Sequence, residues 1–181
     1  MSLAESKPPG PLLFRTTETE PGIMLRSEVL PSDRDAVRRI VTSSGFFHDF
    51  EVDVAVELVD DRLARGDRSD YRFVFLERAG SVAGYACYGP IACTVGSFDL
   101  YWIAVDAVVR GAGLGRALLA EVERRIDDSG GRNIYIETSS RPLYEPTRAF
   151  YQRCGYRQEA RLSGFYAPDD DKLIYVKTLP A

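Results

Sequence analysis

Residues 110–116 read Arg110-Gly-Ala-Gly-Leu-Gly-Arg116 and set three glycines between a strand-like segment and a helix-like segment. Glycine lets backbone N–H groups approach an anion closely, and the N-terminus of the helix that follows adds a favourable dipole. The stretch therefore predicts a loop that binds a phosphate-bearing ligand. The glycines alone fit a plain turn into a helix about equally well. The surrounding sequence is therefore needed to distinguish a phosphate-binding loop from a plain turn.

The spacing of the glycines differs from two common phosphate-binding fingerprints. A dinucleotide fingerprint, G-x-G-x-x-G, would need a glycine where Arg116 stands, and it normally follows the first strand of a domain. A P-loop would need Gly-Lys-Ser/Thr after its second glycine, and the chain has no such tripeptide here. A generic nucleotide-binding domain is therefore a weak alternative.

The segments on both sides of the loop alternate between β-rich runs and amphipathic helices. Before the loop, the pattern predicts a strand over 23–30, a helix from Ser32 to Gly45, a helix ending at Gly66, a hairpin of 71–78 with 81–88, and a strand over 98–105. After it, the pattern predicts a helix over 114–126, a strand over 133–138, a helix over 146–154, and a final hairpin within 156–178. Ser32 and Asp35 resemble a capping box, and Ala79-Gly80 suits a tight hairpin turn.

Length and composition indicate one globular domain, which we place at residues 22–181 behind a flexible tail over 1–21. The tail carries Lys7-Pro-Pro-Gly-Pro11, and its apolar patch is too short for a signal peptide. No apolar stretch approaches the roughly 20 residues of a membrane helix. The three cysteines form no C-x-x-C pair, which favours neither a disulfide framework nor a zinc site. We therefore expect a cytoplasmic protein that does not bind a membrane.

The formal charge of −4 argues against a surface that binds nucleic acid, because such surfaces carry an excess of Lys and Arg. A weakly acidic protein suits a cationic small-molecule partner, although net charge alone decides little. We therefore expect no nucleic-acid partner.

Two motifs carry a resemblance to the GNAT superfamily of acyl-CoA-dependent N-acyltransferases. Arg110-Gly-Ala-Gly-Leu-Gly115, preceded by strand residues 103–105, resembles the Arg/Gln-x-x-Gly-x-Gly/Ala that opens a helix in that family. Thr147-Arg-Ala-Phe-Tyr-Gln-Arg-Cys-Gly-Tyr156 resembles the aromatic-Tyr-x-x-x-Gly-aromatic end of a later helix in the family. The order of strands and helices over residues 22–178 is similar as well.

The resemblance implies an α/β (α+β) fold with a mixed, twisted sheet of six or seven strands, flanked by about four helices. Its strands 4 and 5 would splay apart, and acetyl-CoA would lie in the gap; no metal is implied. The residues expected to bind this cosubstrate are Arg110, Gly111, Ala112, Gly113, Leu114, Gly115 and Arg116 for the pyrophosphate, and Ile103, Ala104 and Val105 for the pantetheine. The backbone of residues 103–105 would also donate to the thioester carbonyl as an oxyanion site.

Acyl transfer to an amine needs a neutral amine, a stabilised tetrahedral intermediate and a proton for the departing thiolate. The resemblance implies that Tyr151 is the general acid that supplies this proton; packing as a core residue beside Phe150 is the alternative. The candidate bases are Glu137, ranked first, and Asp99, and a solvated or salt-bridged strand residue is an equally good description of either. No cysteine stands where a covalent intermediate would form.

Other residues near these motifs carry weaker expectations. His48, among three phenylalanines, borders the acceptor pocket in the resembling family, but an ordinary packed or surface histidine is favoured. Tyr85, Tyr88, Tyr101 and Trp102 suit sheet packing better than an acceptor cleft. Many relatives have an asparagine where this chain has Tyr144, so a contact of residue 144 with the cosubstrate is in doubt.

The resulting hypothesis is an N-acetyltransferase that moves an acetyl group from acetyl-CoA to an amine of a small molecule or peptide. The attack would be direct, within a ternary complex. A non-catalytic acyl-CoA-binding or regulatory domain is the alternative, and Tyr151 argues against it. The identity of the acceptor and the existence of a homodimer stay open.

Overall fold

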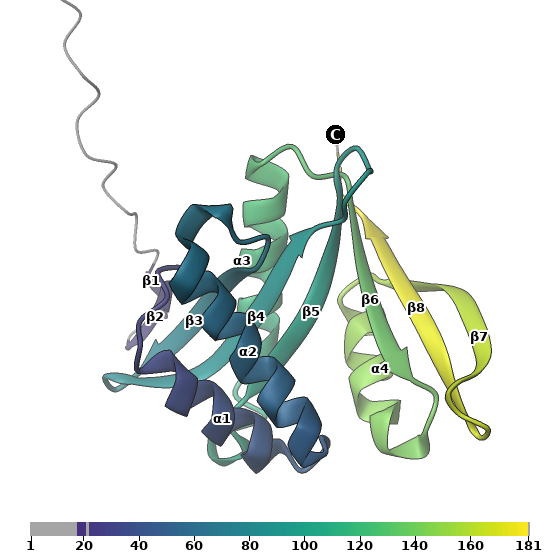
Figure 1. Ribbon diagram of the computed structural model, residues 1–181, viewed down its shortest axis with the longest axis horizontal. Coiled ribbons are helices and arrows are strands. Elements are labelled where there is room, and N and C mark those ends of the chain that lie inside the picture. Colours follow the sequence, from purple (N-terminus) through teal and green to yellow (C-terminus); the bar gives the residue numbers. More distant parts are fainter. Residues whose placement is uncertain (1–17, 21, 181) are drawn as a thin grey trace, which may run out of the picture.

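The computed structural model describes residues 18–20 and 22–180, which form one eight-stranded sheet with helices on both faces (Figure 1). The sheet has the order β1-β2-β3-β4-β5-β6-β8-β7. Its strands are β1 Glu18–Glu20, β2 Ile23–Arg26, β3 Arg72–Arg78, β4 Ser81–Pro90, β5 Ser97–Val105, β6 Asn133–Ser139, β7 Arg157–Ala167 and β8 Asp170–Thr178. The α-helices are α1 Asp33–Ser44, α2 Asp49–Arg65, α3 Leu114–Asp128 and α4 Glu145–Arg153.

The sheet is antiparallel except at its centre, where β5 runs parallel to β6. These two strands pair only over Ser97–Asp99 and Asn133–Tyr135, and beyond that point they separate. Figure 1 shows the sheet opening there into two halves. The prediction of a mixed sheet with splayed central strands is therefore confirmed. The strands that splay, β5 and β6, are the fourth and fifth strands predicted from the sequence.

The short strand β1 extends the sheet by one strand beyond the six or seven that we expected. It pairs antiparallel with β2 and lies inside the range 1–21 that we expected to be a tail. The remaining residues of that range, 1–17 and 21, lie outside the described part of the chain.

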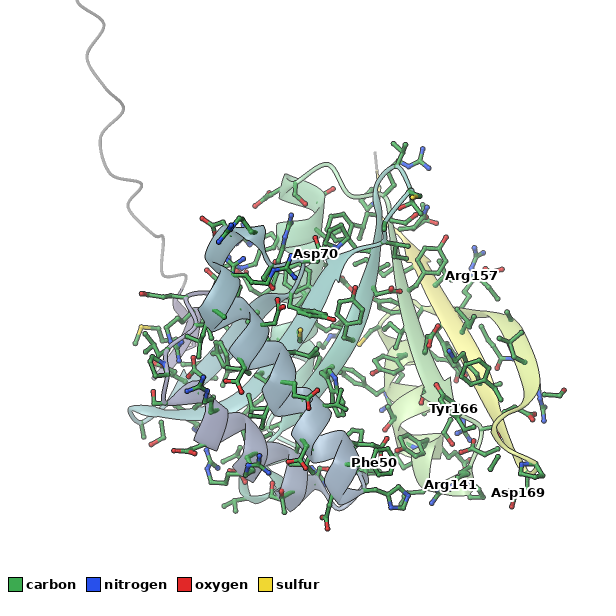
Figure 2. All side chains as sticks on the ribbon, viewed as in Figure 1. Phe50, Asp70, Arg141, Arg157, Tyr166 and Asp169 are labelled. Carbon is green, nitrogen blue, oxygen red and sulfur yellow. The ribbon has the colours of Figure 1, made fainter. Side chains whose placement is uncertain are left out.

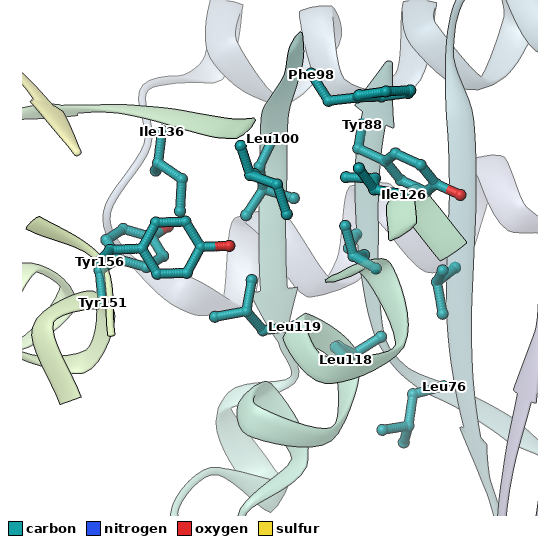
Figure 3. Packing of buried hydrophobic residues seen from close by; sticks show 14 of the residues in the cluster. Leu76, Tyr88, Phe98, Leu100, Leu118, Leu119, Ile126, Ile136, Tyr151 and Tyr156 are labelled. Atoms are coloured by element: carbon teal, nitrogen blue, oxygen red, sulfur yellow. The ribbon is translucent and has the colours of Figure 1, made fainter. Parts of the chain in front are cut away.

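Two hydrophobic cores hold the helices against opposite faces of the sheet. One face packs against α1 and α2, through residues such as Ile40, Val59 and Phe75. The other face packs against α3 and α4, and its cluster includes Leu118 and Tyr151 (Figure 3). Within residues 18–20 and 22–180, no helix has the length and apolar content needed to cross a membrane.

The predicted capping box of α1 is wrong, although the helix itself is confirmed. Ser32 makes no side-chain cap hydrogen bond. Asp33 instead accepts from the backbone N–H of Leu30 at 2.7 Å and pairs with the guanidinium of Arg26 at 2.9 Å. A carboxylate that also pairs with a cation is a stronger hydrogen-bond acceptor than a serine hydroxyl. The backbone before α1 is therefore held by Asp33, one residue after Ser32.

Candidate active site

The loop between β5 and α3 has the backbone that its glycines allow. Gly111 and Gly113 have φ of 83° and 77°, in the left-handed region that most residues avoid, and Gly113 is the N-cap of α3. A Cβ atom built at either position would meet nothing within 4 Å. Conformation and not crowding therefore requires glycine here, and the space in front of the loop is open.

The backbone amides of this loop are available to a ligand. In the described part of the chain, the N–H groups of residues 111–115 donate to no acceptor. The amides of Arg116 and Ala117 already donate to the carbonyl of Gly113, at 3.0 and 3.1 Å. The expected row of amides therefore ends at Gly115, because the amide of Arg116 closes the first turn of the helix.

The side chain of Arg110 holds the loop in place. Its guanidinium donates to the carbonyl of Ser44 at 3.2 Å and lies over the ring of Phe46, 5.3 Å from the centroid. Both partners belong to the C-terminal end of α1 and the connection that follows. Arg110 thus ties the loop to α1.

The end of β5 presents an unpaired edge next to the loop. Ile103, Ala104 and Val105 pair with β4 on one side, whereas β6 has already left the other side at Asp99. A register shift places Tyr101 in a β-bulge opposite β4. Bulges bend a strand and redirect its side chains, and here the bulge coincides with the start of the splay.

Tyr151 lies in the core on the α3 and α4 face of the sheet. Its side chain is 5% exposed and packs near the ring of Tyr156 (Figure 3). The ring of Tyr175 lies 6.3 Å away, counted between centroids. We find no hydrogen-bond partner for its hydroxyl among the described residues. Burial, with a smaller contribution from Cys154, raises the pKa of Tyr151 well above its ordinary value. The hydroxyl is therefore a neutral donor at physiological pH.

Asp99 and Glu137 come together on the opposite face, at the point where β5 and β6 separate. Their neighbours Leu100 and Ile136 point into the α3 core, so alternation along the strands turns both carboxylates toward the α1 and α2 face. Burial first, and the charge of Glu137 second, raise the pKa of Asp99, while Lys172 opposes the increase. Asp99, Glu137 and Lys172 are therefore close enough to interact electrostatically.

Glu137 forms an ion pair with Lys172, a residue that lies outside the sequence motifs. The ammonium of Lys172 on β8 lies 2.5 Å from its carboxylate and 3.6 Å from the centroid of the Phe165 ring. The ring centroid of Tyr166 on β7, labelled in Figure 2, lies 5.7 Å from the same ammonium. Burial, followed by Glu137, raises the pKa of Tyr166 to about 12.

Tyr144 and His48 have structural roles. The hydroxyl of Tyr144 donates to the carbonyl of Phe46 at 3.2 Å, which links the α4 side of the splay to the α1–α2 connection. His48 is exposed, and its backbone N–H donates to Glu51 at the start of α2. The favoured interpretation of His48 as an ordinary surface residue agrees with this position.

The aromatic strand residues divide between the core and the surface. Tyr85 and Tyr88 are buried, whereas Tyr101 is 38% exposed and packs edge-on against Tyr71. Trp102 lies 4.7 Å from the ring of Phe47, counted between centroids. Across residues 18–20 and 22–180, no three His, Cys, Asp or Glu side chains gather where they could hold a metal ion.

Known proteins resemble this chain in sequence and in fold. The model of the acetyltransferase (GNAT) family matches residues 36–156. An uncharacterized N-acetyltransferase of Methanocaldococcus jannaschii is 31% identical over 113 residues, which are 60% of this chain and 67% of that protein. The crystal structure of a putative GNAT acetyltransferase from Desulfovibrio desulfuricans is 50% identical, with a TM-score of 0.85 over 86% of this chain and 98% of that one.

The fold alone extends the likeness to more distant proteins. A GNAT family acetyltransferase from Elizabethkingia anophelis, solved with acetyl-CoA bound, is 15% identical, with a TM-score of 0.64 over 88% of this chain and all of that one. The family match covers the open amides, the free strand edge and Tyr151 together. This chain belongs to the GNAT family of acetyltransferases.

Proposed function

We propose that the protein transfers the acetyl group of acetyl-CoA to a primary amine of a small molecule or peptide, by direct attack within a ternary complex. The observation that carries this proposal is the row of unpartnered amides at 111–115, set at a helix N-terminus beside the free edge of β5. The amides suit the pyrophosphate, and the strand edge suits the amides of pantetheine. Acetyl-CoA bound to a protein of the same fold supports this choice of cosubstrate.

The residues on the two faces of the sheet divide the chemistry between them. Tyr151, on the α3 and α4 face, donates a proton to the departing thiolate, and its raised pKa keeps that proton in place until it is needed. The backbone N–H groups at the end of β5 stabilise the charge that develops on the carbonyl oxygen. The amine enters from the opposite face, where the carboxylates and exposed aromatic rings lie.

We rank Asp99 ahead of Glu137 as the group that takes the proton of the incoming ammonium. The carboxylate of Glu137 is half exposed and already paired with Lys172. Asp99 lacks an ion pair among the described residues, and its raised pKa brings it nearer to the range useful for a base. This reverses the order that we expected from the sequence.

The Glu137→Gln substitution separates the two candidates. Since the charge of Glu137 raises the pKa of Asp99, removing that charge lowers it, and Asp99 stays ionised at lower pH. The acidic limb of the kcat/KM profile then moves to lower pH while activity is kept. A fall of about 10²- to 10⁴-fold in kcat/KM would instead make Glu137 the base. Asp99→Asn should show that fall.

A screen of amine acceptors tests the proposed function itself. Incubation of the protein with acetyl-CoA and each amine should release CoA thiol, and mass spectrometry should show the acceptor heavier by one acetyl group. Amines with a free primary group should react, and the matched tertiary amines should not. Binding of acetyl-CoA without amine-dependent thiol release across the panel would favour the non-catalytic acyl-CoA-binding domain.

A further inference from the structure

A cavity lies at the far end of α3, away from the glycine loop. It has a volume of about 380 Å³ and is lined by residues of α2, β3, β4 and α3. Helix α3 has 15 residues, so its C-terminal end lies about 20 Å from Gly113. Figure 1 shows the C-terminal ends of α2 and α3 at the same end of the molecule. The cavity is therefore separate from the site proposed for acetyl-CoA.

The cavity exists because β2 is shorter than β3. The last residue of β2, Arg26, pairs with Phe75, so the first residues of β3 have no strand beside them. Ser27, Arg72 and Phe73 line the cavity at this uncovered edge. The two helix ends then enclose the edge from opposite faces of the sheet.

Four arginines line the cavity: Arg62, Arg72, Arg124 and Arg125. Asp128 lines it as well, and Glu121 pairs with Arg124 and Arg125 from within α3. Four guanidinium groups against these two carboxylates and Asp67, which pairs with Arg62 at 2.7 Å, leave one net positive charge. Asp67 is 99% exposed, so solvent screens its pairing with Arg62 more than the pairs that the buried Glu121 makes.

The arginines differ in how many of their donors are already used. Arg124 is held by Glu121 through two hydrogen bonds of 2.8 Å and by Asp128 at 2.5 Å. Arg125 donates to Glu121 through Nε alone, and its terminal nitrogens keep their donors. Arg72 makes no ion pair in the described part of the chain, and its guanidinium lies over the Phe98 ring, 5.6 Å from the centroid.

Tyr88 adds a hydroxyl to these free donors. It is the cross-strand partner of Arg72 and therefore lies on the same face of the sheet. In Figure 3 its hydroxyl points away from Leu100. Burial raises the pKa of Tyr88, the charges of Arg125 and Arg72 oppose that increase, and the charge of Glu121 adds to it. We find no hydrogen-bond partner for this hydroxyl among residues 22–180.

We propose that this cavity binds a small phosphate-bearing anion. Arg62, Arg72 and Arg125 supply the charge and the forked donors that suit phosphate oxygens, and the Tyr88 hydroxyl supplies a further donor. Arg124, fixed by its two carboxylates, supports Arg125 by sharing Glu121. The excess of guanidinium groups over carboxylates favours an anion, and the unused donors of Arg72 and Arg125 suit phosphate oxygens. The inference is independent of the acetyl-transfer proposal, because none of these residues belongs to that site.

Pyrophosphate is the probe, and the glycine loop has to be blocked because it would bind the same anion. Calorimetric titration of pyrophosphate into the full chain saturated with CoA should show one site. Arg72→Gln and Arg125→Gln should each weaken this binding by about tenfold to a hundredfold. Arg62→Gln, on the helix surface, is the variant least expected to disturb folding. If CoA itself does not bind, the titration uses the Gly113→Asp chain.

Arg78→Gln is the matched control, because Arg78 is an exposed arginine at the opposite end of the same strand. It should leave pyrophosphate affinity unchanged at constant ionic strength. Absence of binding to the blocked wild-type chain would overturn the proposal, as would an equal loss in Arg78→Gln. Citrate bound as tightly as pyrophosphate would overturn the assignment to phosphate.

Discussion

Gly113→Asp should lower the affinity for acetyl-CoA by about 10²-fold or more, since it sets a carboxylate where the pyrophosphate is expected. The amides of residues 111–115 are the donors that the substitution obstructs. The fold should survive, because a Cβ atom at this position meets nothing within 4 Å, and aspartate tolerates a φ of 77° better than most residues. Calorimetric titration of acetyl-CoA, with the melting temperature as a folding check, measures the effect.

Gly113→Asn separates charge from bulk in this experiment. Asparagine has nearly the shape of aspartate, tolerates the left-handed region and carries no charge. It should therefore retain part of the affinity that Gly113→Asp loses. Undiminished binding to a folded Gly113→Asp chain would remove the glycine loop from the site.

Tyr151→Phe should lower kcat by about 10²- to 10⁴-fold, the usual contribution of a general acid, while acetyl-CoA binding survives. The change removes only the hydroxyl, so the ring packing against Tyr156 and Tyr175 is preserved. Single-turnover measurement of CoA release, made beside a titration of acetyl-CoA, distinguishes loss of chemistry from loss of binding.

Tyr175→Phe is the control for the loss of a buried hydroxyl in the same cluster. Its ring centroid lies 6.3 Å from that of Tyr151, and its hydroxyl is within 3.5 Å of Gln158. This variant should keep its kcat. Equal turnover in Tyr151→Phe and wild type would return Tyr151 to the role of a core residue.

The elements nearest the glycine loop were predictable because local patterns determine them. The helix after the loop has a continuous apolar stripe from Leu114 to Ile126, all buried in the structure. The Ala79-Gly80 turn was predictable as well, because a glycine in a two-residue connection suits a tight hairpin turn, and both residues have the positive φ of the type I′ turn. The Ser32 cap failed because its competitor, Asp33, is stabilised by Arg26, a partner supplied by a strand.

The parts of the site that depend on distant pairs could not be read from the sequence. Glu137 was ranked above Asp99 because nothing local shows that Lys172, on another strand, holds its carboxylate. That contact follows from the register of β6 with β8, which sets Ser139 opposite Lys172. The arginine cavity has the same origin, since it forms only where β2 stops short beside β3.

Titration of acetyl-CoA into the wild-type protein, followed by calorimetry, tests the central claim most directly. The open amides at residues 111–115 and the free edge of β5 predict saturable binding with one molecule of acetyl-CoA per chain. Pyrophosphate should compete with it at the loop. Absence of saturable binding at millimolar acetyl-CoA, in a protein that is folded by its melting curve, would contradict the account.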